Sequence, residues 1–298
     1  MRRFYRNRFL RIVPVYILAL ISVFYVIPLL TNSYQVPKTT DQLIYYFYIQ
    51  NYFPLKIIDN EYVLLGHFWS IAVEMQFYIL WPVVIYNFRS VTIVKIALYL
   101  ILVFAFIRSG LIFNHTDWGV TFSWTPFRID GLLLGSVASV WMASGRIAPS
   151  LLNRLWLITA VLAIIVAWFI WTGKATEMVK MGTWLENKII RSTVPSIVSI
   201  FFTFILILSL HNNQLTSFLS LRLWKPIARY SYGIYVIHYM LIPTFYSTLY
   251  RVLESFQLLS SEMVIYAYFL SCSVISFVLA FISYHFYEIH FLKLKHPN

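Results

Sequence analysis

The chain has 298 residues, of which 60% are hydrophobic and 11% are charged, and its mean hydropathy is +0.73. Soluble domains carry about 25% charged residues, so the composition excludes a soluble enzyme and predicts a polytopic helical membrane protein. The net charge of +12 would suggest nucleic acid only if it lay on an exposed basic surface. With Cys272 as its single cysteine, the chain cannot form an intramolecular disulfide.

Apolar runs predict eight membrane spans in an all-α bundle, each near the ~20 residues that a bilayer requires except the short fourth. The expected spans are 12–31, 67–86, 93–113, 127–142, 152–172, 193–211, 230–250 and 264–286. The first run is long and lacks a small-residue cleavage site, so it is expected to be retained rather than cleaved as a signal peptide. A short interfacial helix is expected near residues 43–52. Because no soluble domain is long enough to fold alone, we expect one integral-membrane domain over residues 1–298.

The basic residues predict the orientation of the spans. With a cytoplasmic N-terminus, the inside segments hold 14 basic residues and one acid, whereas the outside segments, which include Arg108, hold eight of each. The whole excess of positive charge then lies on one side of the membrane. Membrane orientation therefore accounts for the charge without nucleic acid, and both termini are expected to be cytoplasmic.

The second span carries more polar groups than a lipid-facing helix needs. On a helix, His67, Ser70, Glu74, Tyr78 and Trp81 fall at steps of three or four, so they share one face. An ionisable group at membrane depth is costly, so Glu74 is expected to face the bundle interior and a partner or a cavity. Structural pairing with an arginine and organisation of a polar cavity are both open roles, and the position of Glu74 near the outer boundary favours the cavity.

Further polar groups occur in the fourth and seventh spans. Arg128 is the natural counter-ion for Asp130 or for Glu74 of the second span. Because Arg128 and Asp130 are two residues apart, they point to roughly opposite sides of a helix and are expected to contact different partners. Gly131 and Gly135 have the spacing that allows close helix approach. His238 lies midway along the seventh span, where catalysis and a structural hydrogen bond to a Ser or Tyr are equally open. No metal-ligand spacing, phosphate loop or Gly-x-Ser-x-Gly motif occurs.

The arginines at the N-terminus have two interpretations. They can simply fix topology, which is the usual role of such clusters. Arg8 and Arg11 also lie one helical turn apart just before Pro14, so they could form a compact anion site at the inner membrane surface. Arginine forks suit the phosphates of a nucleotide-bearing thioester.

Several blocks of sequence resemble the integral-membrane acyltransferase family 3, in the order in which that family has them. They are FYRNRFLRIVP at 4–14, FWSIAVEMQFYILWP at 68–82, RIDGLLLG at 128–135 and SYGIYVIH at 231–238, and SYHFYE at 283–288 resembles the family's last helix. The resemblance implies an O-acyltransferase, in particular an O-acetyltransferase, of the bacterial inner membrane. It would move an acyl group from acyl-CoA to a hydroxyl of a cell-surface glycan or its lipid-linked precursor.

This hypothesis assigns roles to the polar residues. A histidine would deprotonate the acceptor hydroxyl while nearby donors polarise the thioester carbonyl. The candidate catalytic residues are Glu74, His238, Arg128 and Asp130, the candidate donor-binding residues are Arg8 and Arg11, and the candidate acceptor-binding residues are His67, Trp69, Ser70 and Tyr78. Acyl-CoA would be a co-substrate, and no bound cofactor or metal is expected.

The chain departs from the family pattern at its start. Family members resemble a ten-helix bundle whose first helix carries a histidine regarded as the base, whereas this chain begins at the arginine block. We therefore expect an N-terminally truncated form, and an inactive fragment is one alternative. The other is a transporter of glycolipid or small solutes that uses the same charged cavity.

Overall fold

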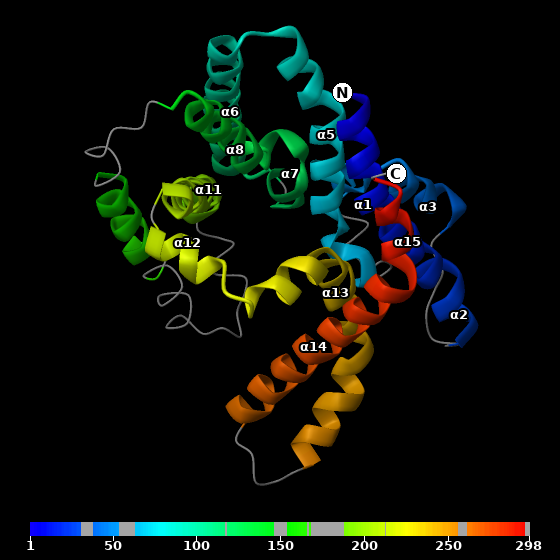
Figure 1. Cartoon of the computed structure of the whole chain (residues 1–298). Helices are drawn as coiled ribbons and strands as arrows, with labels where there is room; N and C mark the ends of the chain where they lie inside the picture. Colours follow the sequence, from blue (N-terminus) through cyan, green and yellow to red (C-terminus); the bar gives the residue numbers. More distant parts are fainter. Residues whose placement is uncertain are drawn as a thin grey trace. The chain divides into compact units, whose positions relative to one another are not determined.

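The structure, a computed structural model, describes residues 1–30, 38–53, 63–116, 118–145, 154–165, 167, 188–211, 213–255 and 261–295. All regular elements in these ranges are helical (Figure 1). The helices long and apolar enough to cross a membrane are Arg2–Leu29, Leu64–Asn87, Ser90–Phe113, Lys188–His211 and Tyr266–Lys293. Five of the eight expected spans are thereby confirmed at full length, and the chain is an all-α, multi-pass membrane protein.

The other three expected spans have different outcomes. The fourth corresponds to α8 (Asp130–Ala143), whose 14 residues are fewer than a bilayer crossing needs. It stops there because the chain turns at Gly145, which has a positive φ of 63°. Of the fifth, Arg154–Ile165 is an apolar helix, and the end of this span falls outside the described residues. The seventh lies within α13 (Trp224–Ser255), a continuous helix of 32 residues.

The chain divides into two compact units. We call Met1–Ala72 together with Arg222–Asn298 the terminal unit, and Val73–Leu221 the central unit. The helix α5 (Trp69–Asn87) begins in the first of these and continues in the second.

The terminal unit is built from both ends of the chain. Its N-terminal part comprises α1 (Arg2–Ile21), a π-helical turn (Ser22–Val26), α2 (Ile27–Leu30), α3 (Thr39–Tyr46) and the 3₁₀ turns Gln50–Tyr52 and Val63–Phe68. Its C-terminal part comprises α13, α14 (Ser261–Ser283), a π-helical turn (Tyr284–Glu288) and α15 (Ile289–Lys293). The two long helices α13 and α14 lie side by side (Figure 1). The helix and 3₁₀ turn at residues 39–52 correspond to the interfacial helix expected near 43–52.

A buried hydrogen-bond network joins three of these elements. The Gln50 side chain, which has no exposed surface, donates to the Tyr16 hydroxyl at 3.2 Å and to the Phe68 carbonyl at 2.8 Å. The Tyr16 hydroxyl in turn donates to the Tyr45 carbonyl at 2.8 Å. The rings of Tyr16 and Tyr48 stack with centroids 4.4 Å apart. The turn that ends at Phe68 is therefore held against α1 and the 3₁₀ turn by buried polar contacts, which position the residue before it, His67.

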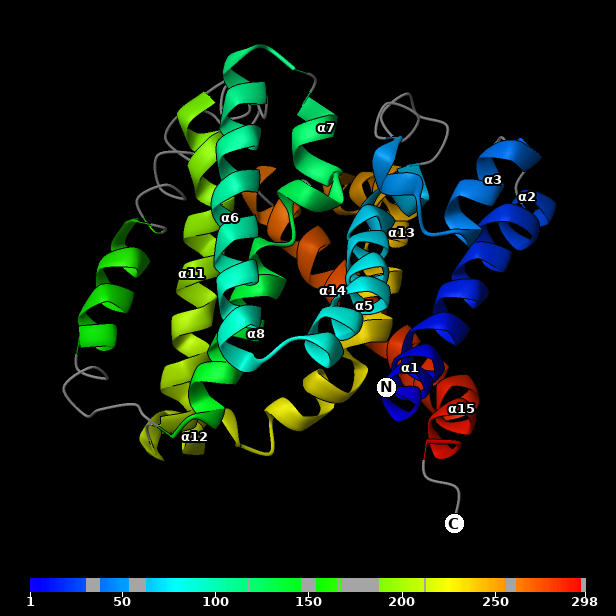
Figure 2. The same ribbon diagram turned by 90° about the horizontal axis from the view of Figure 1, so that it is seen from above.

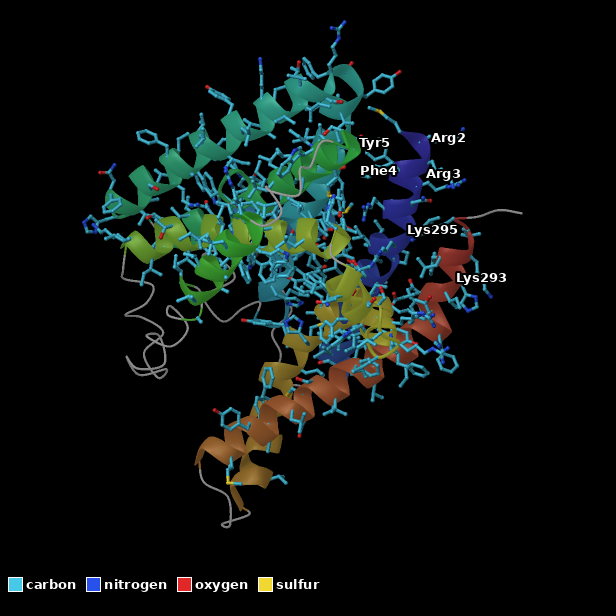
Figure 3. All side chains as sticks on the ribbon, turned by 60° about the vertical axis from the view of Figure 1, so that its left-hand side comes forward. Arg2, Arg3, Phe4, Tyr5, Lys293 and Lys295 are labelled. Carbon is cyan, nitrogen blue, oxygen red and sulfur yellow. The ribbon has the colours of Figure 1, made fainter. Side chains whose placement is uncertain are left out.

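The two ends of the chain meet in the terminal unit. A guanidinium nitrogen of Arg6 donates to the Lys295 carbonyl at 3.0 Å, and the Tyr232 hydroxyl donates to the Ile12 carbonyl at 2.9 Å. Figure 3 shows the first residues of α1 beside the end of α15, with Arg2, Arg3, Lys293 and Lys295 labelled. This proximity is what two termini on one side of a membrane require.

The central unit comprises most of α5, α6 (Ser90–Phe113), α7 (Trp118–Ser123), the 3₁₀ turn Thr125–Phe127, α8, α11 (Lys188–His211) and α12 (Asn213–Leu219). The helices α6, α8 and α11 pack against one another (Figure 2). Trp81 on α5 donates its ring N–H to the Ser136 hydroxyl on α8 at 2.8 Å. A Cβ at Gly131 would approach the Ser199 hydroxyl to 3.2 Å, so the predicted close approach is confirmed there. At Gly135 an added Cβ would meet no described atom within 4 Å.

Candidate functional site

A cluster of polar side chains in the terminal unit brings together three of the residues selected from sequence. We call His67, Ser70, Tyr235 and His238 the histidine cluster. His67 stands in the 3₁₀ turn Val63–Phe68, and Ser70 in the first turn of α5. The predicted span that includes His67 is confirmed as Leu64–Asn87, but its first residues wind as a 3₁₀ turn up to Phe68 and the chain becomes α-helical only at Trp69.

His67 is held across to α13 by its Nε2 atom, which lies 3.1 Å from the Val236 carbonyl. A carbonyl oxygen can only accept, so Nε2 carries the hydrogen and the neutral ring has its lone pair on Nδ1. The ring also lies 5.1 Å from the ring of His238, 5.3 Å from Tyr235 and 5.0 Å from Tyr239, measured between centroids. His67 is thus enclosed by aromatic rings of α13.

His238 is anchored within its own helix. Its Nδ1 donates to the Tyr235 carbonyl, one turn earlier, at 2.6 Å. The neutral ring then has its lone pair on Nε2. Neither the predicted catalytic role nor the structural alternative of a hydrogen bond to a Ser or Tyr of another helix is decided by this contact, which is to the backbone.

The hydroxyl groups of Ser70 and Tyr235 hydrogen-bond to each other. Both also reach the His67 carbonyl, Ser70 at 3.1 Å and Tyr235 at 3.0 Å. The cluster therefore holds two ring lone pairs, which can accept a proton from a hydroxyl as acyl transfer requires. Its two hydroxyl groups have one hydrogen each, and the contacts with the His67 carbonyl and with each other engage both.

The central unit contains Glu74 and Tyr78, one turn apart on α5. The Tyr78 hydroxyl donates to a carboxylate oxygen of Glu74, and both side chains are half-buried. The structure therefore gives Glu74 a hydrogen-bond partner on its own helix, and the expectation that it faces the bundle interior stays a prediction. Trp69 is half-buried at the start of the same helix.

Asp130 takes part in a buried ion pair that joins α6, α8 and α11. One carboxylate oxygen lies 3.5 Å from Arg108 and accepts from Ser196 at 3.1 Å, and the other accepts from the Gly131 N–H at 2.9 Å and from Ser199 at 3.3 Å. Both oxygens are thus engaged by donors of the protein. These contacts favour a role in holding the three helices together.

The sequence analysis placed Arg108 in an outer segment and gave it no role. In the structure its side chain is buried, with only 2% exposed. Its guanidinium donates to the Phe127 and Ser192 carbonyls at 2.7 and 3.1 Å and to the Ser196 hydroxyl at 2.7 Å. Its position five residues before the end of an apolar helix was the available signal. Arg128, expected to be the counter-ion, places its guanidinium 4.9 Å from the Phe122 ring centroid.

The predicted donor-binding arginines lie near a lysine from the other end of the chain. Partial burial, and then the positive charges of Arg11 and Arg8, lower the pKa of the Lys295 ammonium. Like charges disfavour each other, so this effect indicates that the three cations share one region. We call Arg8, Arg11 and Lys295 the cationic cluster. Such a cluster suits a ligand with several negative charges.

The predicted site residues therefore fall into separate groups. The histidine cluster holds His67, Ser70 and His238, and the cationic cluster holds Arg8 and Arg11, both in the terminal unit. Glu74 with Tyr78, Asp130 with Arg108, and Arg128 belong to the central unit. Within the described ranges, no group of three or more His, Cys, Asp or Glu side chains could hold a metal ion.

Comparison with known proteins identifies the family. The family model described as Acyltransferase domain (Acyl_transf_3) matches residues 1–287. The chain is also 23% identical over 300 residues to the O-acetyltransferase OatA of Staphylococcus aureus, in strains NCTC 8325, COL and MRSA252. These matches cover 96% of this chain and 46% of each relative, so the chain spans about half the length of the curated relatives it matches. No solved structure matches. Because the family match covers nearly the whole chain, the chain belongs to this acyltransferase family.

Proposed function

We propose that the protein is a membrane O-acyltransferase, in particular an O-acetyltransferase. It would move an acyl group from acyl-CoA to a hydroxyl of a cell-surface glycan or its lipid-linked precursor, in the inner membrane of a bacterium. The observation that carries the proposal is the acyltransferase family match over residues 1–287. The name O-acetyltransferase of the OatA relatives supports oxygen as the acceptor atom and acetyl as the group.

The cationic cluster supports a donor with phosphate groups. Acyl-CoA carries several phosphates, and arginine forks bind phosphate oxygens through two parallel hydrogen bonds. Arg8 is half-buried and Arg11 is exposed on α1, so a bound nucleotide could reach their guanidinium groups. Lys295 would add a third positive charge from the C-terminal end of the chain. In this proposal the donor approaches from the side of the membrane that holds both termini.

The histidine cluster supports the chemistry of acyl transfer. The acceptor hydroxyl loses its proton to an imidazole lone pair as its oxygen attacks the thioester carbonyl carbon. The carbon–oxygen bond forms, the carbon–sulfur bond breaks, and the leaving thiolate takes up the proton from the imidazolium. The hydroxyl group of Ser70 or Tyr235 could stabilise the oxyanion formed in between by turning its hydrogen away from the His67 carbonyl.

The remaining candidate residues receive supporting roles in the proposal. Glu74, with the Tyr78 hydroxyl on its carboxylate, would orient hydroxyl groups of the acceptor, and Trp69 would provide an aromatic surface for a sugar ring. Arg128 would line the polar region of the central unit. Asp130 would act through the helices that it joins, because both of its carboxylate oxygens are occupied.

Labelled acetyl-CoA tests the proposal directly. Membranes that contain the protein are incubated with acetyl-labelled CoA and their own glycolipids, and label in the glycan is measured against membranes from a deletion strain. We expect label to appear as an ester that mild base removes. Label that enters sealed vesicles without becoming covalently attached would instead identify a transporter and contradict the proposal.

A further inference from the structure

The π-helical turn Tyr284–Glu288 contains an acidic residue that the proposed function does not use. Glu288 is 8% exposed, and its side chain reaches α13. A Cβ at Gly233 on α13 would lie 3.1 Å from the Oε1 atom of Glu288, so the carboxylate occupies space that exists because residue 233 has no side chain. π-Helical turns inside α-helices occur frequently at functional sites.

The Glu288 carboxylate has few partners within the protein. The Ser283 hydroxyl donates to Oε1 at 3.1 Å. Among the residues that the structure describes, no other group donates to the carboxylate and no cation forms an ion pair with it. A carboxylate has about four lone-pair sites, and burying its charge is costly unless hydrogen bonds or a cation compensate. The missing partners are therefore hydrogen-bond donors.

The Glu288 carboxylate also lies beside the cationic cluster. The Tyr287 hydroxyl, from the preceding residue, donates to the Pro14 carbonyl at 3.4 Å. The Tyr232 hydroxyl, from the residue before the glycine on α13, donates to the Ile12 carbonyl at 2.9 Å. Both neighbours of the carboxylate are thus bonded to α1 within one turn of Arg11, whose charge acts on it. A negative charge therefore stands next to the cations assigned to the phosphates of the acyl donor.

A structural ion pair does not account for this carboxylate. Arg11 is exposed, and in the described part of the chain its guanidinium does not contact Glu288. A phosphate group is repelled from the carboxylate, whereas a hydroxyl or N–H group is attracted to it. A nucleotide-bearing thioester has both kinds of group, with phosphates for the cations and hydroxyl and N–H groups for the carboxylate.

We infer that Glu288 is a specificity-determining residue for the acyl donor, and that its carboxylate accepts a hydrogen bond from a hydroxyl or N–H group of the nucleotide-bearing thioester that the cationic cluster holds. This inference rests on the proposed function. The cations attract any molecule with several phosphates. The carboxylate favours, among these, a molecule that also offers a hydrogen-bond donor beside its phosphates, and it repels one that offers phosphates alone.

Two substitutions at Glu288 separate this role from a structural one. Glu288→Gln keeps the size of the side chain and removes its charge, whereas Glu288→Asp keeps the charge and withdraws the carboxylate by one methylene. Asp41→Asn is the matched control, because Asp41 is an equally buried acid, 8% exposed, on α3 of the same unit. Each purified protein is titrated in detergent with CoA and with inorganic tripolyphosphate, and the two dissociation constants are compared.

We expect Glu288→Gln to weaken CoA binding by about tenfold or more, because a hydrogen bond to a charged group is lost. The same variant should bind tripolyphosphate as tightly as the wild type or more tightly, since a charge that repels phosphate is gone. Glu288→Asp should weaken CoA binding and leave tripolyphosphate binding within about twofold of the wild type. Asp41→Asn should bind both ligands as the wild type does.

Folding of the variants is checked by helical circular dichroism and by the temperature of thermal unfolding. A neutral amide is easier to bury than a carboxylate, so Glu288→Gln is expected to fold. A parallel loss of affinity for CoA and tripolyphosphate in this variant would show that the carboxylate only supports the shape of the cluster, and the inference would be wrong.

Two further results would also overturn the inference. They are CoA binding by Glu288→Gln within about twofold of the wild type, and a wild-type protein that does not bind tripolyphosphate. In each case transfer of labelled acetyl groups by wild-type membranes would leave the proposed function intact. A wild-type protein that neither binds CoA nor transfers acetyl groups would contradict the proposed function itself.

Discussion

The two units solve the problem of polar groups in an apolar protein in different ways. The central unit buries a charged pair, Arg108 and Asp130, and surrounds it with carbonyl and hydroxyl partners from the 3₁₀ turn Thr125–Phe127 and from α11. The terminal unit groups neutral side chains, His67, Ser70 and Tyr235, around backbone carbonyls.

The two groups differ in which buried atom has no hydrogen-bond partner among the described residues. The atom of Arg108 without a partner among the described residues is Nε, a donor that has no lone pair to offer. The corresponding atom of His67 is Nδ1, which can accept a proton. The charged network of the central unit therefore joins helices, whereas the neutral cluster of the terminal unit keeps a lone pair to which a hydroxyl group could donate.

The largest effect is expected from Arg108→Met, which leaves the Asp130 carboxylate buried without its cation. Removing one partner of a buried ion pair costs about 3–5 kcal/mol. The free energy of unfolding, measured by denaturant titration in detergent, should fall by that amount. The double substitution Arg108→Met with Asp130→Asn should recover much of the loss because no buried charge remains. A single variant as stable as wild type would contradict a structural role for the pair.

The next largest effect concerns the hydrogen bonds of Gln50, which hold the turn that contains His67. Gln50→Leu removes the side-chain donor to the Phe68 carbonyl and to the Tyr16 hydroxyl, which should cost about 1 kcal/mol of stability for each lost hydrogen bond and also lower kcat. The same change at Gln42, whose side chain accepts from Tyr25 at 3.2 Å, is the control. If Gln42→Leu lowers kcat as much as Gln50→Leu, the network does not act through His67.

Glu74→Gln tests whether the central unit contributes to chemistry at all. The amide oxygen can still accept from the Tyr78 hydroxyl, and loss of the charge should cost only about 1 kcal/mol of stability. If the carboxylate orients the acceptor, transfer should fall about tenfold, the equivalent of one further hydrogen bond to a charged group. Tyr78→Phe separates the hydroxyl from the carboxylate. Full acetylation of the glycan by the Gln variant would indicate that Glu74 does not contribute to the chemistry and that the central unit has a structural role only.

The smallest effect is expected at the cationic cluster. Lys295→Ala should raise the KM for acyl-CoA by about two- to fivefold with kcat unchanged, since a partly exposed charge contributes about 0.2–1 kcal/mol. The effect should shrink as salt is added. Lys225→Ala removes an exposed lysine of α13 as the control. Equal values of KM for both variants at low salt would place the donor elsewhere.

Much of the fold could be predicted from the composition and from the length and spacing of the apolar runs. Apolar runs located α1, α6 and α11 because a bilayer demands about 20 apolar residues, a requirement visible along the sequence. The boundary at Trp69 could not be predicted, because a 3₁₀ turn and an α-helix accept the same side chains and the choice depends on the contacts of Phe68 with Gln50.

The candidate site was only partly predictable. His67, Ser70 and His238 stood out because polar residues interrupt apolar runs, but their meeting depends on the packing of α13 against the turn before α5. Arg108 was missed since an arginine near the end of a span equally suits the membrane surface. Lys295 joins Arg8 and Arg11 from the far end of the chain, a proximity that no local pattern records.

The assembly of the terminal unit from both ends of the chain also sets an order of events during synthesis. The central unit, residues 73–221, is complete when the ribosome has yet to translate Val236 and Lys295. His67 and Arg6 wait for their carbonyl partners until the last quarter of the protein has entered the membrane. The histidine cluster is therefore completed only near the end of translation, so an interrupted polypeptide would contain the helices of the central unit and lack the anchored His67.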